Sequence, residues 1–151
     1  HKGMIDRSFR HAIGNRIFGC DDCLAICPWN KFASLAKEQK LAAKAGTELP
    51  PLADLLKLDD ADFRQFFAGT PVRRAGYERF LRNVLIAAGN SGDADLMLLV
   101  APFLDHSSVL LRAMAIWALR QLADDDIWQG LRRVYLPDER DQTVRREWQD
   151  N

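Results

Sequence analysis

The three cysteines of this chain lie in one short segment, and their spacing limits what that segment can do. They occur as C-x2-C-x3-C-P, with a proline directly after the third, at Cys20, Cys23 and Cys27. A short cysteine cluster closed by Cys-Pro is typical of iron–sulfur segments, in which thiolates bind the irons of a cubane cluster. Three thiolates are one fewer than a [4Fe–4S] cluster needs. The pattern therefore predicts that at least one ligand comes from outside this chain.

Three interpretations of these cysteines are open from the local spacing alone. An odd number of cysteines in a short chain without a secretory signal argues against a disulfide framework. An iron–sulfur segment is favoured, because the x3 spacing followed by proline suits a cubane cluster. A zinc site of the Cys3His type is the second interpretation, in which His11 joins the three thiolates. Inert, buried thiols are the third.

The bacterial ferredoxin pattern adds a rule for dividing the ligands between two clusters. In that pattern, the cysteine that precedes the proline binds the other cluster of a two-cluster pair. By this rule Cys20 and Cys23 share one cluster, and Cys27 reaches a second. The remaining ligands of both clusters would come from elsewhere.

Length and charge narrow the class of protein. With 151 residues, the chain is expected to be one domain, or a small domain with an appendage. No apolar run approaches the roughly 20 residues needed to cross a bilayer, so no membrane partner is expected. The 21 basic and 21 acidic residues exclude a polycation that binds nucleic acid along its whole length, but not a local basic face. Because the chain begins with His1, we interpret it as the C-terminal piece of a longer protein.

The remaining sequence predicts helices and no strands. Apolar residues recur at helical spacing, and no stretch alternates convincingly with period two. The glycine-punctuated residues 1–19 are expected to be irregular. Helices are expected over 31–44, 52–57, 60–68, 77–89, 94–104 and 108–122, followed by two that begin near Asp124 and Asp141.

Short polar residues ahead of the helices predict where they begin. The expected N-caps are Asp93, Ser107, Asp124 or Asp125, and Asp141. Residues 89–92, Gly-Asn-Ser-Gly, are expected to form a turn. The residues expected to pack inward include Ile127, Leu131 and Val134, together with Trp117, Trp128 and Trp148.

An internal repeat indicates how these helices are arranged. Leu81-Arg82 and Leu111-Arg112 are 30 residues apart, and each is followed by an apolar helix and an acidic turn. Helix pairs that recur at this period are typical of an α-solenoid of HEAT-like repeats. A plain four-helix cluster with a chance match is the alternative. We therefore divide the chain into a cysteine segment (1–33), a helical linker region (34–75) and a repeat domain (76–151).

Four arginines fall within ten residues at the start of this repeat domain. Arg73, Arg74, Arg79 and Arg82 are opposed only by Glu78, and two aromatic residues lie among them. Phosphate binding favours such a cluster where a loop enters a helix. An ordinary solvated helix face with local salt bridges is the alternative interpretation.

Three stretches of this sequence resemble one protein family. Residues 14–33 (GNRIFGCDDCLAICPWNKFA) are similar to the second cluster segment of the epoxyqueuosine reductases. Residues 67–74 (FAGTPVRR) and 79–93 (RFLRNVLIAAGNSGD) resemble the C-terminal helical-repeat region of that family. The match spans nearly the whole chain. The extension of the cysteine motif through Trp29-Asn30 is specific enough to disfavour zinc.

The resemblance implies an oxidoreductase of tRNA modification. These enzymes reduce epoxyqueuosine at the tRNA wobble position to queuosine, with a cobalamin and two [4Fe–4S] clusters. It implies that Cys20 and Cys23 bind one cluster and Cys27 the other, within half of a ferredoxin-like segment. The cobalamin site and the general acid belong to parts of the family that this chain does not contain, so no residue is named as catalytic. The fragment alone is expected to be inactive.

The resemblance also implies partners and a compartment. The helical repeats would face the anticodon arm of tRNA through Arg73, Arg74, Arg79 and Arg82, an external donor would supply electrons, and the protein would be cytoplasmic. Two other functions are possible from the residues. One is a stand-alone helical-repeat interaction module with a zinc-bound or vestigial cysteine loop. The other is a different iron–sulfur electron carrier without an RNA role.

Overall fold

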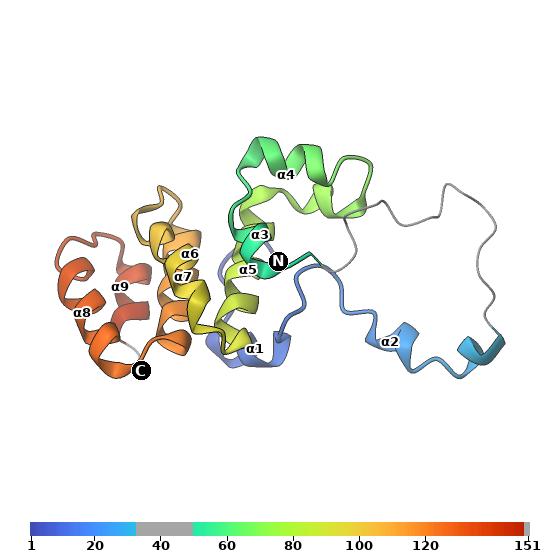
Figure 1. The fold of residues 1–151 in the computed structure, drawn as a ribbon, viewed down its shortest axis with the longest axis horizontal. Coiled ribbons are helices and arrows are strands. Elements are labelled where there is room, and N and C mark those ends of the chain that lie inside the picture. Colours follow the sequence, from blue (N-terminus) through green and yellow to red (C-terminus); the bar gives the residue numbers. More distant parts are fainter. Residues whose placement is uncertain (33–49, 150–151) are drawn as a thin grey trace.

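The structure is a computed structural model that describes residues 1–32 and 50–149. Within these ranges the chain is helical and has no β-strand, which confirms the predicted all-α fold (Figure 1). None of the helices in these ranges is long and apolar enough to cross a membrane. The α-helices are α1 (Arg7–Ile13), α2 (Asp22–Ala25), α3 (Leu52–Leu56), α4 (Asp60–Phe66), α5 (Tyr77–Ser91), α6 (Met97–Val100), α7 (Val109–Leu122), α8 (Asp125–Tyr135) and α9 (Gln142–Gln149). The 3-10 helices are η1 (Pro28–Phe32), η3 (Pro71–Ala75), η4 (Ala94–Leu96) and η5 (Ala101–Asp105).

Helix α7 forms the centre of the helical part of the molecule. It packs against α5 on one side and α9 on the other, and α1 lies against α5 (Figure 1). Every residue from Ala113 to Leu119 is at most 3% exposed, so α7 contacts protein on nearly all sides. Trp117, Trp128 and Trp148 are buried as predicted, and the last two stack with 5.0 Å between ring centroids. The classification of these helices as HEAT-like repeats stays a prediction.

Aspartate side chains begin several of the helices, as the sequence predicted. The Asp124 carboxylate accepts a hydrogen bond from the Ile127 backbone N–H at 2.8 Å, and Asp141 accepts one from Thr143 at 2.8 Å. Asp93 caps η4 in the same way. Each such cap satisfies an amide that has no partner inside the helix, which stabilises a helix by about 1 kcal/mol. These local signals explain why most helix boundaries were predicted to within two residues.

The N-terminal segment differs from its prediction. Residues 7–13 form helix α1 instead of irregular chain, and Asp6 caps it by accepting from the Ser8 backbone N–H at 2.9 Å. Too short to be stable by itself, this helix is held by contacts with distant residues, which local sequence cannot reveal. The helix expected over 31–44 lies mostly outside the described residues.

The helix expected over 94–104 is divided into η4, α6 and η5. Pro102 explains the break between α6 and η5, because its ring nitrogen cannot donate a hydrogen bond and its ring clashes with the preceding turn of an α-helix. The next helix begins one residue later than expected. Ser108, not Ser107, is the N-cap residue of α7, and its hydroxyl hydrogen bonds to Glu78 instead of capping the helix.

Helix α8 turns a different face to the core from the one expected. Trp128 is fully buried, whereas Ile127 and Val134 are exposed. Leu131 is half-buried at the edge of the interface. The large indole of Trp128 removes more apolar surface from water than the smaller side chains beside it. Stacking of Trp128 on Trp148 therefore fixes the rotation of the helix.

Helix α5 continues through the predicted turn at residues 89–92. It ends at Ser91 and is capped by Gly92, whose left-handed backbone (φ 69°) favours glycine. Gly89 is inside the helix, where it allows α5 and α7 to approach closely. A Cβ atom at Gly89 would lie 2.7 Å from the Trp117 ring and 2.9 Å from the Cα of Ala118. The glycine that sequence reasoning assigned to a turn is therefore a packing residue.

We expect Gly89→Ala to destabilise the protein by about 1–3 kcal/mol, the usual cost of overpacking. Gly130 provides a matched control, since it is also inside a helix but a Cβ there meets nothing within 4 Å. Gly130→Ala should stabilise the protein by up to about 1 kcal/mol through helix propensity. Urea unfolding of the two variants measures both effects. A Gly89→Ala variant as stable as the wild type, or stabilised like Gly130→Ala, would contradict close packing at Gly89.

Candidate functional site

The cysteine segment folds into one compact turn. Helix α2 follows Asp21, which has a left-handed backbone (φ 51°). The main-chain carbonyl of Asp21 accepts hydrogen bonds from the backbone N–H groups of Leu24 and Ala25. Pro28 then starts η1, and the Asn30 side-chain amide donates to the Leu24 carbonyl at 2.6 Å. The turn is thereby closed on both sides of Cys27. Sequence reasoning noted Asn30 only as part of a motif and did not assign it this role.

The thiols of this turn are free. Cys20 and Cys23 are exposed, and Cys27 is half-buried. The interpretation as inert, buried thiols is therefore wrong for Cys20 and Cys23. Three soft thiolate donors suit iron–sulfur clusters or zinc and do not suit hard, oxygen-seeking cations. The donor set thus fits part of a cluster site.

His11 does not join the cysteines. Its ring packs edge-on against Trp117, with 5.3 Å between ring centroids, and its Nδ1 lies 3.2 Å from Asn90 Oδ1. Among the described residues, no three His, Cys, Asp or Glu side chains converge on a metal position. The alternative Cys3His zinc site is therefore not formed in the part of the chain that the structure describes.

Large apolar side chains surround the cysteines and face solvent. Their exposed fractions range from 50% to 82%, and they are Phe18, Leu24, Ile26, Trp29 and Phe32. Trp29 and Phe32 also pack on each other, with 5.6 Å between ring centroids. Exposed apolar patches are typical of surfaces that contact another protein, a membrane or a ligand. The cysteine segment therefore offers both free thiols and a surface for burial.

Two of the four predicted arginines form an exposed cationic hollow. Arg73 and Arg74 lie on η3 and are exposed. They line a hollow of about 520 Å³ together with Gly69, Thr70 and Pro71. Arg79 is half-buried, and its Nη2 donates to the Arg74 carbonyl at 3.3 Å. These three arginines remain candidates for contact with phosphate.

Arg82 does not belong to this surface, which corrects the expectation that it faces tRNA together with the other three arginines. Arg82 is only 5% exposed, and burial lowers the pKa of its guanidinium. Its Nη1 donates to the Gly3 carbonyl at 2.7 Å, and its Nε donates to Asn83 Oδ1 at 3.0 Å. The N-terminal segment covers this face of α5, a tertiary contact that arginine spacing cannot predict.

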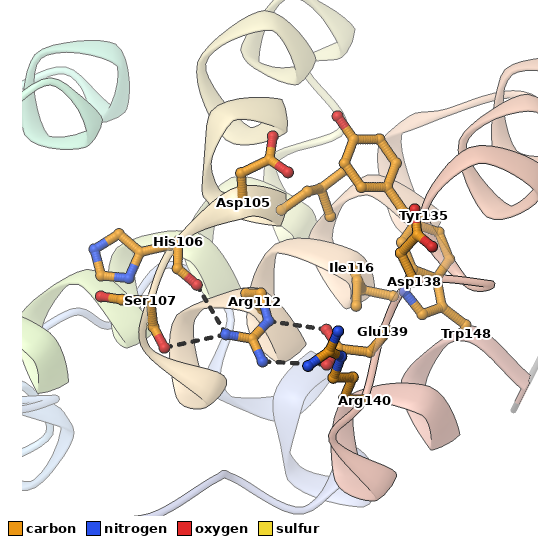
Figure 2. A pocket seen from close by; sticks show the side chains of 11 residues that line it. Asp105, His106, Ser107, Arg112, Ile116, Tyr135, Asp138, Glu139, Arg140 and Trp148 are labelled. Carbon is orange, nitrogen blue, oxygen red and sulfur yellow. Dashed lines mark hydrogen bonds and ion pairs between the residues drawn. The ribbon is translucent and has the colours of Figure 1, made fainter.

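A second hollow of about 350 Å³ lies where the η5–α7 and α8–α9 loops meet (Figure 2). Arg112 donates to both carboxylate oxygens of Glu139 and to the carbonyls of His106 and Ser107 (Figure 2). Burial acts to raise the pKa of Glu139, but hydrogen bonds from Arg112 and the Asp141 backbone outweigh it and hold that pKa below its usual range. Because the Arg112 donors are engaged, this contact joins the two loops and is not an open anion site.

The chain is similar to curated proteins named epoxyqueuosine reductase, whereas no protein-family model matches it. It is 42% identical over 122 residues to the one from Xanthomonas campestris, a match that covers 80% of this chain and 34% of that protein. The Alicycliphilus denitrificans protein is 42% identical over 129 residues, a match that covers 80% of this chain and 36% of that protein. The Escherichia coli protein is 33% identical over 120 residues, and this match covers 80% of this chain and 32% of that protein. The chain thus spans about a third of the length of these relatives.

Solved structures agree with this similarity. A selenomethionine-labelled epoxyqueuosine reductase has a TM-score of 0.91 and 25% identity, covering 99% of this chain and 40% of that one. An epoxyqueuosine reductase with an epoxyqueuosine-modified tRNA-Tyr stem loop gives a TM-score of 0.90 at 25% identity, with the same coverage. The epoxyqueuosine reductase from Streptococcus thermophilus has a TM-score of 0.84 at 28% identity. The similarity in fold therefore includes the cysteine segment as well as the helices.

Proposed function

We propose that this chain, which is homologous over about 80% of its length to proteins named epoxyqueuosine reductase, is the C-terminal portion of such an enzyme. The whole protein would reduce epoxyqueuosine in tRNA to queuosine. This portion would supply cluster ligands and a surface that faces the tRNA. The observation that carries the proposal is the turn of Cys20, Cys23 and Cys27, which holds free thiols and is closed by Pro28 and Asn30. No residue of this chain is assigned a catalytic role.

Two [4Fe–4S] clusters fit the donor set. Cys20 and Cys23 would bind one cluster, and Cys27 would bind the other, according to the rule for a cysteine that precedes proline. The clusters would supply single electrons at low potential, and the cobalamin, held outside this chain, would supply the bond chemistry. We classify the segment as half of a ferredoxin-like unit.

The chain's own residues would hold these thiols in place and keep water from them. Asp21 and Asn30 fix the turn through hydrogen bonds to its main chain. The exposed apolar residues beside the cysteines, Trp29 and Phe32 among them, would be covered in the assembled protein. Burial of that apolar surface would stabilise the assembly. It would also lower the solvent exposure of the clusters, which influences their potential.

The helical domain would bind the anticodon arm of tRNA, and a solved epoxyqueuosine reductase that contains a tRNA stem loop supports this partner. Arg73, Arg74 and Arg79 are the residues that would contact phosphate. Arginine suits this role because its planar fork meets phosphate oxygens with two hydrogen bonds. Such contacts position the RNA without reading its bases. We also propose that helices α5 to α9 are HEAT-like repeats and that an external donor supplies the electrons.

Two rival functions make different predictions. A helical interaction module with a zinc-bound or vestigial cysteine loop would be colourless and hold no inorganic sulfide. Another iron–sulfur carrier would hold iron and sulfide but would not bind tRNA. Iron, sulfide and tRNA-binding measurements on protein prepared without oxygen separate the three functions.

We expect the double variant Arg73→Ala, Arg74→Ala to bind all substrate tRNAs more weakly. For every phosphate that the variant no longer neutralises, the dependence of log affinity on log salt should flatten by roughly 0.7 to 0.9. Titrations of the intact protein with tRNA at several salt concentrations measure this slope. The unfolding temperature should barely change, because exposed charges contribute little to stability.

Arg132 and Arg133 provide a matched control. They also line a hollow, of about 370 Å³, at the C-terminal end of α8. Their double replacement by alanine should leave the slope unchanged. An equal effect of the two double variants would indicate general charge attraction, and no effect of either would leave Arg73 and Arg74 as an ordinary solvated face. A large fall in thermal stability would make Arg73 and Arg74 structural residues.

A further inference from the structure

The N-terminal segment is attached to helix α5 by side chains that bind its main chain. Arg82 Nη1 donates to the Gly3 carbonyl at 2.7 Å, and Asn90 Nδ2 donates to the carbonyls of Arg10 and Gly14 at 2.8 and 3.0 Å. Because each acceptor is a backbone carbonyl, these bonds fix the path of the segment whatever its side chains are. Helix α5 therefore acts as a template along which residues 1–17 are placed.

The last of these attachments precedes the cysteines by three residues. Asn83 Nδ2 donates to the Ile17 carbonyl at 2.7 Å. Arg82 Nε donates to Asn83 Oδ1 at 3.0 Å, which orients the amide so that its N–H group faces Ile17. Beyond this point, hydrogen bonds in which both partners are described keep residues 18–32 within the segment 16–32, such as Arg16 with Asp22. Within the part of the chain that the structure describes, Asn83 is thus the last hydrogen-bonded anchor before Cys20.

In the described ranges, little packing with the helical part replaces the hydrogen bonds beyond this anchor. A hollow of about 600 Å³ lies between residues 15–21 and apolar side chains of the helical part, which include Leu55, Phe67 and Phe80. Cys20 is exposed at the edge of this hollow. A small rotation of the chain at Ile17 would therefore move the cysteines without meeting a packed core.

Helix α5 also begins directly after the arginines of η3. Tyr77 is its first residue, and Asn83 is six residues later, which corresponds to about 9 Å of helix. Helix α5 thus follows the proposed phosphate-binding residues Arg73 and Arg74 and includes Arg79. The side of the same helix binds residues 1–17, which lead to the cysteines. The reaction proposed above requires RNA and electrons to reach one place in a fixed geometry.

We propose that Asn83 is a positioning residue, which fixes Ile17 and thereby sets where Cys20 and Cys23 lie relative to the arginine surface. This inference rests on the proposed function, because the distance matters only if the cysteines hold a cluster and the arginines hold RNA. A misplacement of about 1 Å far from the chemistry can lower a rate by about 100-fold. Removal of this anchor should therefore affect turnover more than binding.

The variant Asn83→Asp in the intact protein tests the proposal. Aspartate keeps the shape of asparagine and the acceptor for Arg82, but it cannot donate to the Ile17 carbonyl. We expect kcat for the reduction of epoxyqueuosine in tRNA to fall by about 10-fold or more. The affinity for tRNA and the iron content should stay within about twofold of the wild type. Asn83→Gln retains the donor and should recover part of kcat.

Amide hydrogen exchange provides a readout that does not depend on activity. In Asn83→Asp, residues 14–24 should exchange faster, while α5 and α7 keep their protection. Glu139→Gln is the control, because Glu139 is part of an ion pair inside the helical part. It should lower the unfolding temperature without lowering kcat or the protection of residues 14–24.

Three outcomes would overturn the positioning role. One is wild-type kcat and exchange in Asn83→Asp. The second is a fall in kcat with an equal fall in iron content, and the third is a fall in kcat with an equal fall in tRNA affinity. Each of these two results would make Asn83 an ordinary structural residue. A wild-type protein without iron and sulfide would instead overturn the proposed function. The exchange of residues 14–24 would still report whether Asn83 holds the segment.

Discussion

Replacement of Glu147 by glutamine is expected to lower the free energy of unfolding by about 3–5 kcal/mol. Glu147 lies on α9 and is 7% exposed, and Arg10 on α1 is 2% exposed. Arg10 donates to both Glu147 carboxylate oxygens, at 2.9 and 2.7 Å. Arg7 donates to the same carboxylate at 2.9 Å. A neutral glutamine would leave the buried guanidinium of Arg10 without a counter-charge.

The cost follows from desolvation. A charge taken out of water loses hydration that only a close, well-oriented partner replaces. The Arg10 guanidinium also lies 5.7 Å from the centre of the Trp117 ring, and its Nε donates to the Ile5 carbonyl at 2.9 Å. It therefore cannot turn to solvent without breaking other contacts. Removal of the carboxylate should detach α1 and, with it, the start of the segment that leads to the cysteines.

Urea unfolding with Asp60→Asn as the control checks this expectation. Asp60 pairs with Arg64 four residues later on α4, and both side chains are at least half exposed. Removal of this pair should cost less than about 1 kcal/mol. The further change Arg10→Met in the Glu147→Gln background should recover stability, because it removes the unpaired charge. A cost of Glu147→Gln as small as that of Asp60→Asn would show that the buried pair is replaceable.

The same contact explains which parts of the fold the sequence could predict. Helices α5, α7 and α8 were predicted because apolar spacing acts over a few residues, and for α8 the capping Asp124 also marked the start. Helix α1 was missed because Arg10 and Glu147, which hold it, are 137 residues apart in the sequence. Pairing at such a distance leaves no local pattern. Gly89 was placed in a turn for a related reason, since only the packed partner Trp117 reveals its role.

The residues of the candidate site also differ in whether local sequence or tertiary contact reveals their role. The cysteines were predicted as ligands from their spacing alone, because the ligands that one cluster segment supplies are close in sequence. Arg82 was assigned to the exposed surface because its neighbours in sequence are arginines, but residues 1–3 cover it. Asn83 and Asn90 carried no signal at all, since an asparagine that binds a distant carbonyl looks the same as one on a surface. Roles that depend on tertiary contact required the structure.

The second large effect is expected at the cysteines. In intact protein prepared without oxygen, Cys20→Ala and Cys27→Ala should each lack one cluster, which is roughly four of about eight irons. The wild type should be brown, with broad absorbance near about 400 nm. The activity of each variant should fall by more than the roughly 10- to 100-fold that removal of an outer-shell partner costs, because a ligand itself is missing.

Asp22→Asn is the matched control for both variants. Asp22 lies between Cys20 and Cys23, and its carboxylate pairs only with the exposed Arg16 among the described residues. Its replacement should keep the full iron content. A colourless wild type with one tightly bound zinc would contradict the assignment of iron to these thiolates.

The two cysteine variants should also differ from each other. If the cysteine before Pro28 binds a different cluster from Cys20 and Cys23, Cys27→Ala and Cys20→Ala remove different electron paramagnetic resonance signals from the reduced protein. The cluster that is missing in Cys27→Ala should be the one nearer the cobalamin. The absence of the same signal from both variants would place the three thiolates on a single cluster. In that case the turn closed by Asn30 would act as one binding loop, and the division between two clusters would be wrong.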